Sequence, residues 1–206
     1  MSRALIILAG GLSKRFGQDK CLKELVCKPL IVHVLDRVAR LANETLVVVG
    51  SEAQRDQLSR VIGTKAQIIV DKYTDHTPLV GALTGFESVN AAHALLLPCD
   101  AAFVSAEIVA LLLDLCIVKN ATVPRWPDGK IEPLQAAYDV KSAASAAKAA
   151  MQEGKRDMLG MISHLHGIRY VSTLVLRQYD PKLDTFLNIN TVQDWKKAEQ
   201  TLRRAG

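Results

Sequence analysis

The sequence predicts an α/β fold in which a doubly wound, mostly parallel sheet lies between two layers of helices. Its 206 residues, 49% of them hydrophobic, are enough for the buried core of one domain. Short runs of Leu, Ile and Val without polar alternation occur at 4–8, 45–49, 66–70 and 94–98. Such runs are typical of strands buried on both faces. Helical patterns alternate with them, and this β-α-β order indicates a three-layer α/β/α arrangement.

The segments between these strands carry the signals of helices. In 28–42 the apolar residues recur at helical spacing, and Pro29 stands where a first helical turn tolerates it. Segments 52–62 and 105–116 are also predicted to be helices, the second with Ser105 as its N-cap. An open sheet binds ligands at the carboxyl ends of its strands. The connections expected there are 9–20, 50–51, 71–85 and 99–100.

The last third of the chain is less regular. Strands are expected at 120–124 and 133–140, around a turn, and again near 169–176. An alanine-rich helix is predicted from residue 141 to Gly154. Thr191 and Asp194 form a capping box, which predicts that a closing helix begins there.

Composition argues against several classes of protein. No run of roughly 18 apolar residues is present, and the N-terminal segment lacks the pattern of a signal peptide, so we expect a cytoplasmic protein with no membrane partner. The four cysteines have no metal-binding spacing and are expected to be small buried hydrophobic residues in a reducing compartment. The net charge of +5 is spread along the chain and aromatic residues make up 5%, which disfavours nucleic acid as a partner.

The stretch LAGGLSKRFGQDK, residues 8–20, directly follows the first predicted strand and contains three glycines and three cationic residues. Glycines let backbone N–H groups approach an anion closely, and Lys14, Arg15 and Lys20 add full positive charges. We therefore expect this loop to bind a polyphosphate. The stretch fits neither the Walker A pattern nor the dinucleotide pattern GxGxxG, and an ordinary glycine turn with solvated charges is the alternative.

Two aspartates follow later strands of the predicted sheet. Asp71 ends the third strand and Asp100 ends the fourth, so both carboxylates should lie on the same edge as the basic loop. A carboxylate beside a phosphate site is favourable mainly when a divalent cation lies between them. Asp100 is therefore a candidate ligand of Mg²⁺, and a turn or helix-capping role is the alternative.

Taken together, these motifs resemble the signature of nucleotidyltransferases of the molybdenum cofactor guanylyltransferase type, the MobA-like nucleotidyltransferases. The first motif is LAGG-x-S-x-R-F-G-x-D-K at 8–20. The others follow in the family's order: VD at 70–71, TPLVGALTG at 77–85, PCD at 98–100, EPLQAAY at 132–138 and FLNINTVQDW at 186–195. The resemblance implies a Rossmann-like fold and the transfer of GMP from GTP to the terminal phosphate of molybdopterin or the molybdenum cofactor. Pyrophosphate would be released and Mg²⁺ would be the cofactor.

The resemblance also implies roles for individual residues. The implied catalytic residues are Arg15, Lys20 and Asp100, with Asp100 as the metal ligand. The implied nucleotide-binding residues are Leu8, Ala9, Gly10, Gly11, Ser13, Lys20, Asp71 and Asp100. The implied acceptor-binding residues are Lys155, Arg156, Asn188 and Asn190. Within a single domain of residues 1–206, the nucleotide part would span about 1–105 and the acceptor part about 106–206, and other proteins of cofactor biosynthesis are possible partners.

The chain departs from the family pattern at three places. Gly50 stands where family members carry a polar residue such as Asn, PCDAAF lacks the family's proline, and NINTV replaces NINTP. Because Gly50 lies near the expected base site, a related nucleotidyltransferase that uses CTP or another phosphate acceptor stays open. A non-catalytic GTP-binding protein of cofactor assembly is the alternative from another class.

Overall fold

Seven strands form the central sheet of the computed structural model, in the order β5-β4-β1-β6-β8-β7-β9. Their bounds are β1 (Arg3–Leu8), β4 (Glu44–Val49), β5 (Gln67–Val70), β6 (His93–Pro98), β7 (Ala121–Arg125), β8 (Ala137–Asp139) and β9 (Ile168–Ser172). Strand β8 runs antiparallel to its neighbours β6 and β7, whereas the other neighbouring pairs are parallel. The structure describes residues 2–10, 19–73, 75 and 77–205. The predicted doubly wound, mostly parallel sheet is confirmed.

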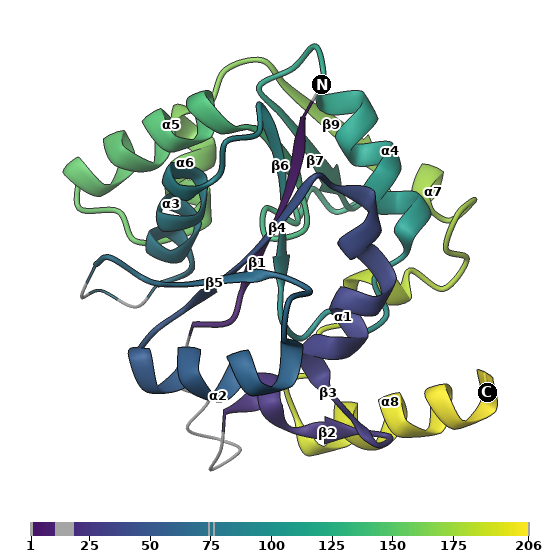
Figure 1. Cartoon of the computed structure of the whole chain (residues 1–206). Helices are drawn as coiled ribbons and strands as arrows, with labels where there is room; N and C mark the ends of the chain where they lie inside the picture. Colours follow the sequence, from purple (N-terminus) through teal and green to yellow (C-terminus); the bar gives the residue numbers. More distant parts are fainter. Residues whose placement is uncertain (1, 11–18, 74, 76, 206) are drawn as a thin grey trace.

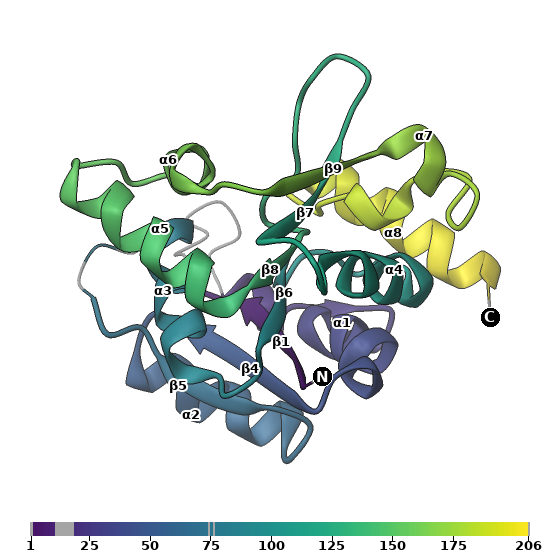
Figure 2. The ribbon, with the colours of Figure 1, turned by 90° about the horizontal axis from the view of Figure 1, so that it is seen from above.

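Helices cover both faces of this sheet (Figure 1). One face carries α1 (Leu30–Val38), α2 (Glu52–Ile62) and α4 (Ala106–Cys116). The other face carries α3 (Pro78–Ser88), α5 (Val140–Gln152) and α6 (Met158–His164). The view from above shows the strands between the two helical layers (Figure 2). The three layers therefore match the expected α/β/α arrangement.

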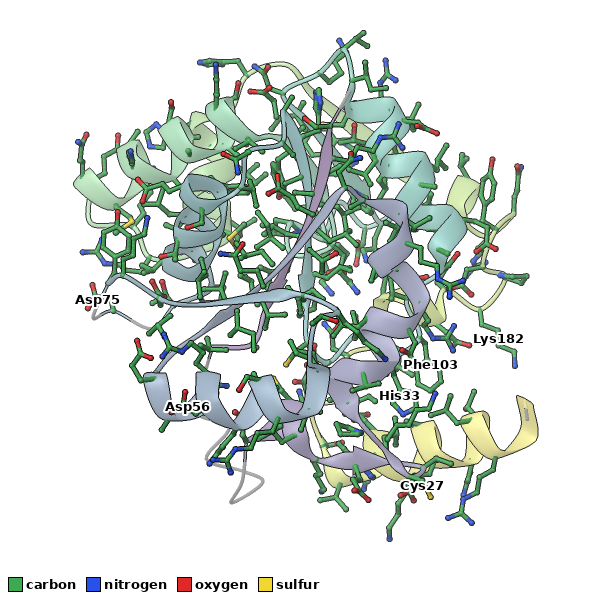
Figure 3. The ribbon with its side chains drawn as sticks, in the orientation of Figure 1. Cys27, His33, Asp56, Asp75, Phe103 and Lys182 are labelled. Carbon is green, nitrogen blue, oxygen red and sulfur yellow. The ribbon has the colours of Figure 1, made fainter. Side chains whose placement is uncertain are left out.

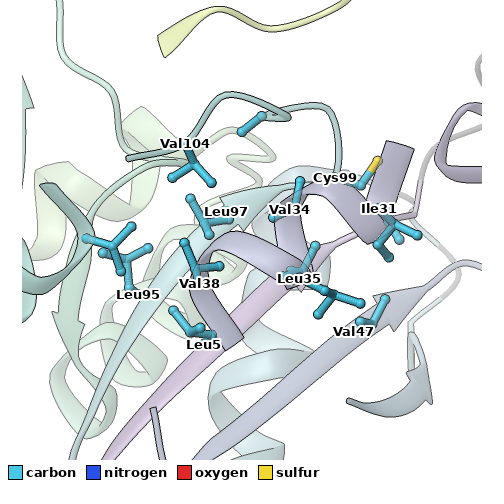
Figure 4. Packing of buried hydrophobic residues seen from close by; sticks show 14 of the residues in the cluster. Leu5, Ile31, Val34, Leu35, Val38, Val47, Leu95, Leu97, Cys99 and Val104 are labelled. Carbon is cyan, nitrogen blue, oxygen red and sulfur yellow. The ribbon is translucent and has the colours of Figure 1, made fainter. Parts of the chain in front are cut away.

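Alternate residues of each central strand face opposite helical layers. Leu5 of β1 and Leu95 and Leu97 of β6 pack beside Val34 and Val38 of α1 (Figure 4). The intervening residues of β1, Ala4 and Ile6, join the cluster beneath α3 and α5. Both faces of these strands are thus buried, which explains why their sequences show no polar alternation.

The chain leaves β1 for β4 and β5 on one side and then crosses to β6 on the other side of β1. The connections that follow β1 and β6 therefore run in opposite directions. In an open parallel sheet, this switch in strand order leaves a crevice at the carboxyl ends of the strands, where ligands bind. Residues that follow β1 and β6 are consequently the first candidates for a site.

Residues 71–85 were expected as a loop, but the structure contains helix α3 in this segment. The Thr77 side chain accepts a hydrogen bond from the Val80 amide, and Pro78 occupies the first turn. Two glycines lower the intrinsic helix propensity and conceal the pattern. Gly85 is required by packing, because a Cβ there would lie 2.5 Å from the Cγ2 of Ile6 in β1.

The first predicted helix begins later than expected. Residues 28 and 29 pair with residues 24 and 25 in an antiparallel hairpin of β2 (Glu24–Leu25) and β3 (Lys28–Pro29). Pro29 is therefore the N-cap of α1 rather than part of its first turn. The hairpin's central residues, Val26 and Cys27, both have positive φ. Because this tight turn contains neither Gly nor Asn, the sequence did not predict the hairpin.

Several elements of the last third also differ from the expectation. The strand expected at 133–140 shortens to β8, because residues 133–135 form a turn. The strand expected near 169–176 ends at Ser172, whose hydroxyl caps the short helix α7 (Thr173–Leu176). Helix α6 was not expected. The predicted helix cap at Ser105 is confirmed, since its hydroxyl accepts from the Ile108 amide at 3.2 Å.

The chain closes with α8 (Val192–Ala205), which lies beside the β2–β3 hairpin (Figure 1). Trp195 and Ile189 are buried there together with Leu25 of the hairpin. The predicted capping box is present: the Asp194 amide donates to the Thr191 hydroxyl at 3.1 Å, and the Thr191 amide donates to Asp194 Oδ2 at 2.9 Å. No helix in the described parts of the chain is long and apolar enough to cross a bilayer.

Candidate active site

Three side chains from distant parts of the sequence meet at the switch point of the sheet. Lys20 begins the short 3-10 helix η1 (Lys20–Leu22), which comes after β1, and Asp100 follows β6. The Lys20 ammonium donates to Asp100 Oδ2 at 2.5 Å and to Asn190 Oδ1 at 2.8 Å. The side chains of Lys20 and Asp100 are only 11% and 12% exposed. The structure therefore brings together two predicted catalytic residues and one predicted acceptor residue.

The second oxygen of Asp100 has no hydrogen-bond partner among the residues that the structure describes. This oxygen, Oδ1, is buried. Carboxylate oxygens suit Mg²⁺, which typically takes one or two carboxylates and fills its shell with substrate phosphates and water. Within the described ranges no group of three or more His, Cys, Asp and Glu side chains could hold a metal. Asp100 thus fits a metal shared with a phosphate ligand rather than one enclosed by protein.

A small pocket opens at the ends of β1, β4 and β5, on the same carboxyl edge of the sheet as this cluster. Its lining residues are Leu8, Gly10, Val48, Asp71, Thr77, Pro78 and Gly81. Leu8, Gly10 and Asp71 are among the residues predicted to bind the nucleotide. The pocket has an apolar wall and one carboxylate, a combination suited to a nucleoside with polar edges.

The carboxylate of Asp71 is held in place by its neighbours. Its Oδ1 accepts hydrogen bonds from the Thr84 hydroxyl at 2.6 Å and from the Tyr73 amide at 3.2 Å. Its Oδ2 faces Gly81 in α3, where a Cβ would lie 3.8 Å away. Asp71 can therefore present one oriented oxygen to the pocket.

Gln54 in α2 ties the ends of β1 and β4 together, a role that the sequence analysis missed. Its Nε2 donates to the Ala9 carbonyl at 2.8 Å, and its Oε1 accepts from the Gly50 amide at 2.8 Å. The amides of Ala9 and Gly10 both donate to the Val48 carbonyl, at 2.8 and 3.1 Å. These bonds fix the backbone at the pocket wall. A glutamine near the start of an exposed helix carries no sequence signal for this role.

The structure describes only some of the other residues that are predicted to bind the nucleotide. Leu8 ends β1, and Ala9 is buried. Gly11, Ser13 and Arg15 lie outside the described residues, as does Lys14. Their predicted roles therefore stay predictions.

The four predicted acceptor residues fall into two groups. Asn190 contacts Lys20, and the Oδ1 of nearby Asn188 is buried with no hydrogen-bond partner among the described residues. Lys155 instead pairs with Glu153 at 2.9 Å, and Arg156 pairs with Asp75 at 3.0 Å. Asp75 lies on the connection that precedes α3 (Figure 3). In the described part of the chain, no hydrogen bond or ion pair joins Lys155 or Arg156 to the Lys20 cluster.

Two cysteines lie directly next to the Lys20–Asp100 pair in the sequence and touch in space. The sulfur atoms of Cys21 and Cys99 are 2.6 Å apart, and both residues are buried. The hydrogen bond with Cys99, together with burial, raises the pKa of the Cys21 thiol well above its usual range. The expectation that all four cysteines are buried is wrong for Cys27, which is exposed because it lies in the hairpin turn.

Comparison with known proteins places these features in a family context. Residues 5–168 match the family model of the MobA-like NTP transferase domain. A Methanosarcina mazei protein named "Probable molybdenum cofactor guanylyltransferase" is 31% identical over 197 residues, which cover 93% of this chain and 88% of that protein. A Bacillus cereus protein of the same name is 30% identical over 203 residues, with 98% of each chain covered. The crystal structure of the molybdopterin-guanine dinucleotide biosynthesis protein A from Archaeoglobus fulgidus superimposes with a TM-score of 0.84 at 28% identity, covering 98% of this chain and 99% of that one.

Proposed function

Because the chain belongs to the family of MobA-like NTP transferases, we propose that it transfers GMP from GTP to the terminal phosphate of molybdopterin or the molybdenum cofactor, with release of pyrophosphate. One structural observation carries the proposal. Lys20, Asp100 and Asn190 converge at the switch point of the sheet, on the same carboxyl edge as a pocket lined by Leu8, Gly10 and Asp71. A cation and a carboxylate with a free oxygen are the groups that a metal-bound triphosphate needs.

The chemistry requires no strong general base from the protein. The attacking phosphate monoester has a second pKa near 6, so it is largely ionised at neutral pH. The residues must instead position the two substrates in line and balance the charge of the phosphates. A site built from Lys20, Asp100 and Asn190, without a histidine, is consistent with this requirement.

Asp100 would hold Mg²⁺ through its free Oδ1, and the metal would supply charge neutralisation at the triphosphate. The Lys20 ammonium would pass from Asp100 to the phosphates that leave as pyrophosphate, and we assign Arg15 the same task. A preorganised cation acts most strongly where charge develops in the transition state.

We assign the remaining residues to two substrate regions. Leu8, Ala9, Gly10, Gly11, Ser13 and Asp71 would bind the nucleotide, and Lys155, Arg156, Asn188 and Asn190 would bind the acceptor. This divides the single domain near residue 105. We also propose a cytoplasmic location, since free cysteines are typical of a reducing compartment, and contacts with other proteins of cofactor biosynthesis.

One observation favours a second candidate within the same chemistry. Gly50 lies next to Gly10 of the pocket lining and has no side chain, and its amide donates to Gln54 Oε1. The residues near the base therefore differ from the family pattern, and a transferase that uses CTP or another phosphate acceptor is the alternative. A protein that binds GTP without turnover is the alternative outside enzymes.

The test is pyrophosphate release from GTP, CTP, ATP and UTP in the presence of Mg²⁺, each with and without molybdopterin. Release only with GTP and molybdopterin is the expected result. Release with CTP would preserve the chemistry and overturn the choice of base. Binding of GTP without any release would overturn the proposed activity.

A further inference from the structure

The two thiols beneath the Lys20–Asp100 pair are arranged for a bond to each other. Their sulfur atoms are 2.6 Å apart, whereas the sulfur atoms of a disulfide are about 2.05 Å apart. The backbone N–H of Cys99 donates to the Leu8 carbonyl at 3.0 Å, and the Cys21 thiol contacts the Ala9 carbonyl at 3.6 Å. Both cysteines are therefore anchored to the end of β1, so little movement is needed for cross-linking.

The other two cysteines lie in different surroundings. Cys27 is exposed in the hairpin turn, and the thiol of Cys116 contacts the Lys119 carbonyl at 3.6 Å. Cys99 belongs to the same core cluster as Ile31 of α1 (Figure 4). Cys99 is 9% exposed and Cys21 is 1% exposed, so a small oxidant reaches Cys99 first.

We propose that Cys21 and Cys99 form a site of reversible oxidation, in which a disulfide between them weakens binding of the metal–nucleotide complex. A hydroperoxide is the oxidant. The sulfur of Cys99 attacks the peroxide oxygen, the O–O bond breaks and water or an alcohol leaves, which gives a sulfenic acid. The sulfur of Cys21 then displaces water from that sulfenic acid and forms the S–S bond. In total the two thiols lose two electrons and two protons, and the peroxide accepts the electrons and the protons.

The cross-link would act on the site through the chain itself. Cys21 follows Lys20, and Cys99 precedes Asp100, so a disulfide ties η1 to the end of β6 one residue away from each partner of the ion pair. In the proposed function the Lys20 ammonium passes from Asp100 to the phosphates. A bond that holds η1 against β6 therefore favours the paired state, in which Asp100 is occupied by the ammonium. This consequence rests on the proposed function, whereas the formation of the cross-link does not.

The cross-link can be tested in a Cys27→Ser background, which removes the exposed thiol. Three free thiols should be titrated before treatment with hydrogen peroxide and one afterwards, since the chain has four cysteines. Digestion with trypsin and a protease that cleaves before aspartate separates the three remaining cysteines into peptides 21–23, 75–99 and 114–119. A covalent link between 21–23 and 75–99 that dithiothreitol reverses is expected. Peroxide treatment that leaves three free thiols, or a link to 114–119, would overturn the proposal.

The effect on the site is measured as affinity for GTP in the presence of Mg²⁺. We expect oxidation to lower this affinity at least tenfold and dithiothreitol to restore it. The Cys21→Ser variant keeps a hydrogen-bonding side chain of similar size but forms no bridge, so peroxide should leave its affinity unchanged. Cross-linked protein with unchanged affinity would overturn the proposal. Failure of the reduced protein to release pyrophosphate would count against the proposed function alone.

Discussion

The ammonium of Lys20 lies 2.5 Å from Oδ2 of Asp100, although 80 positions separate the two residues in the sequence. Both side chains are nearly nine-tenths buried, and Asn190 supplies the ammonium with a second acceptor at 2.8 Å. Burying such a pair costs solvation energy, which good geometry only partly repays. An ion pair at the carboxyl edge of the sheet is therefore better explained by binding a charged ligand than by stability.

Replacement of Lys20 or Asp100 should abolish most of the pyrophosphate-releasing activity. We expect Asp100→Asn and Lys20→Met to lower the rate of pyrophosphate release by about 10²–10³-fold, the usual cost of one preorganised charge contact. Lys65→Met is the matched control, because Lys65 pairs with Asp36 at 2.6 Å on the surface, away from the proposed site. Near-normal turnover of either site variant, with Lys65→Met also normal, would refute the assigned roles.

Loss of the two hydrogen bonds that Gln54 makes to Ala9 and Gly50 should weaken nucleotide binding but leave the rate of the chemical step nearly unchanged. Gln54→Ala frees the Ala9 carbonyl and the Gly50 amide, so the backbone at the pocket wall loses its fixed position. We expect the KM for the nucleotide to rise about tenfold, since one to two hydrogen bonds of roughly 1 kcal/mol each are lost, while kcat changes little. Gln57→Ala, in the same helix but exposed, should leave both constants unchanged. Equal KM values for the two variants would show that the hydrogen bonds of Gln54 have no effect on nucleotide binding.

The two glycines of α3 should respond in opposite ways to the same substitution. At Gly85 a Cβ would lie 2.5 Å from Ile6 Cγ2, so Gly85→Ala should lower the free energy of unfolding by about 1–3 kcal/mol. At Gly81 the nearest atom would be 3.6 Å away, an ordinary contact, and alanine gains up to about 1 kcal/mol of helix propensity over glycine. Gly81→Ala should therefore be neutral or stabilising. Denaturant unfolding of both variants checks this, and similar destabilisation at the two positions would contradict the close approach of α3 to β1.

The parts of the fold that could be predicted are those with a local cause. Strands β1, β4 and β6 are recognisable because burial on both faces requires continuous apolar runs. The edge strand β5 also has an apolar run, although its residues 68–70 are only half-buried. Ser105 and the Thr191–Asp194 pair could be predicted because helix caps depend on the side chain at one position. Asp71 and Asp100 could be assigned to one edge of the sheet because parallel strands end on the same side.

The parts that could not be predicted depend on contacts between distant segments. Helix α3 has two glycines, and only its packing against Ile6 explains Gly85. Gln54 resembles any surface residue until its contacts with Ala9 and Gly50 are known. The contact between Cys21 and Cys99 likewise arises from the joining of η1 to the end of β6, which no spacing in the sequence indicates.

The turn of the β2–β3 hairpin should become more stable with residues that tolerate positive φ. Val26 has φ of 47° and Cys27 has φ of 64°, a conformation that costs non-glycine residues about 1 kcal/mol or more each. Asn-Gly is the preferred pair for a two-residue hairpin turn of this kind. The double substitution Val26→Asn with Cys27→Gly should raise the free energy of unfolding by about 1 kcal/mol. Cys27→Ser keeps a side chain at this position and is the control, and a double variant no more stable than this control would contradict the strain.

The capping box of α8 should make stability depend on pH in the acid range. The Asp194 carboxylate accepts hydrogen bonds from the amides of Asn190 and Thr191 and from the Thr191 hydroxyl, and the bond from this hydroxyl is the main cause that lowers the Asp194 pKa. A group whose folded-state pKa is lowered contributes stability that is fully present above its unfolded pKa, about 3.9, and is lost as the pH falls through the folded value. We therefore expect Asp194→Ala to cost about 1 kcal/mol at pH 7, as for other helix caps, and progressively less below pH of about 4.

Unfolding of wild type and Asp194→Ala at several pH values measures this difference. Glu199→Gln removes a carboxylate from the same helix outside its first turn and is the matched control. Since the Asn190 amide is one of the groups held by Asp194, the Asp194→Ala variant should also displace Asn190, which we assign to the acceptor, and raise the KM for the acceptor. If Asp194→Ala lowers the free energy of unfolding by the same amount at pH 7 and at pH 3, a charged capping role is contradicted. If Asp194→Ala lowers the stability at pH 7 but leaves this KM unchanged, the carboxylate caps α8 without positioning Asn190 in the site.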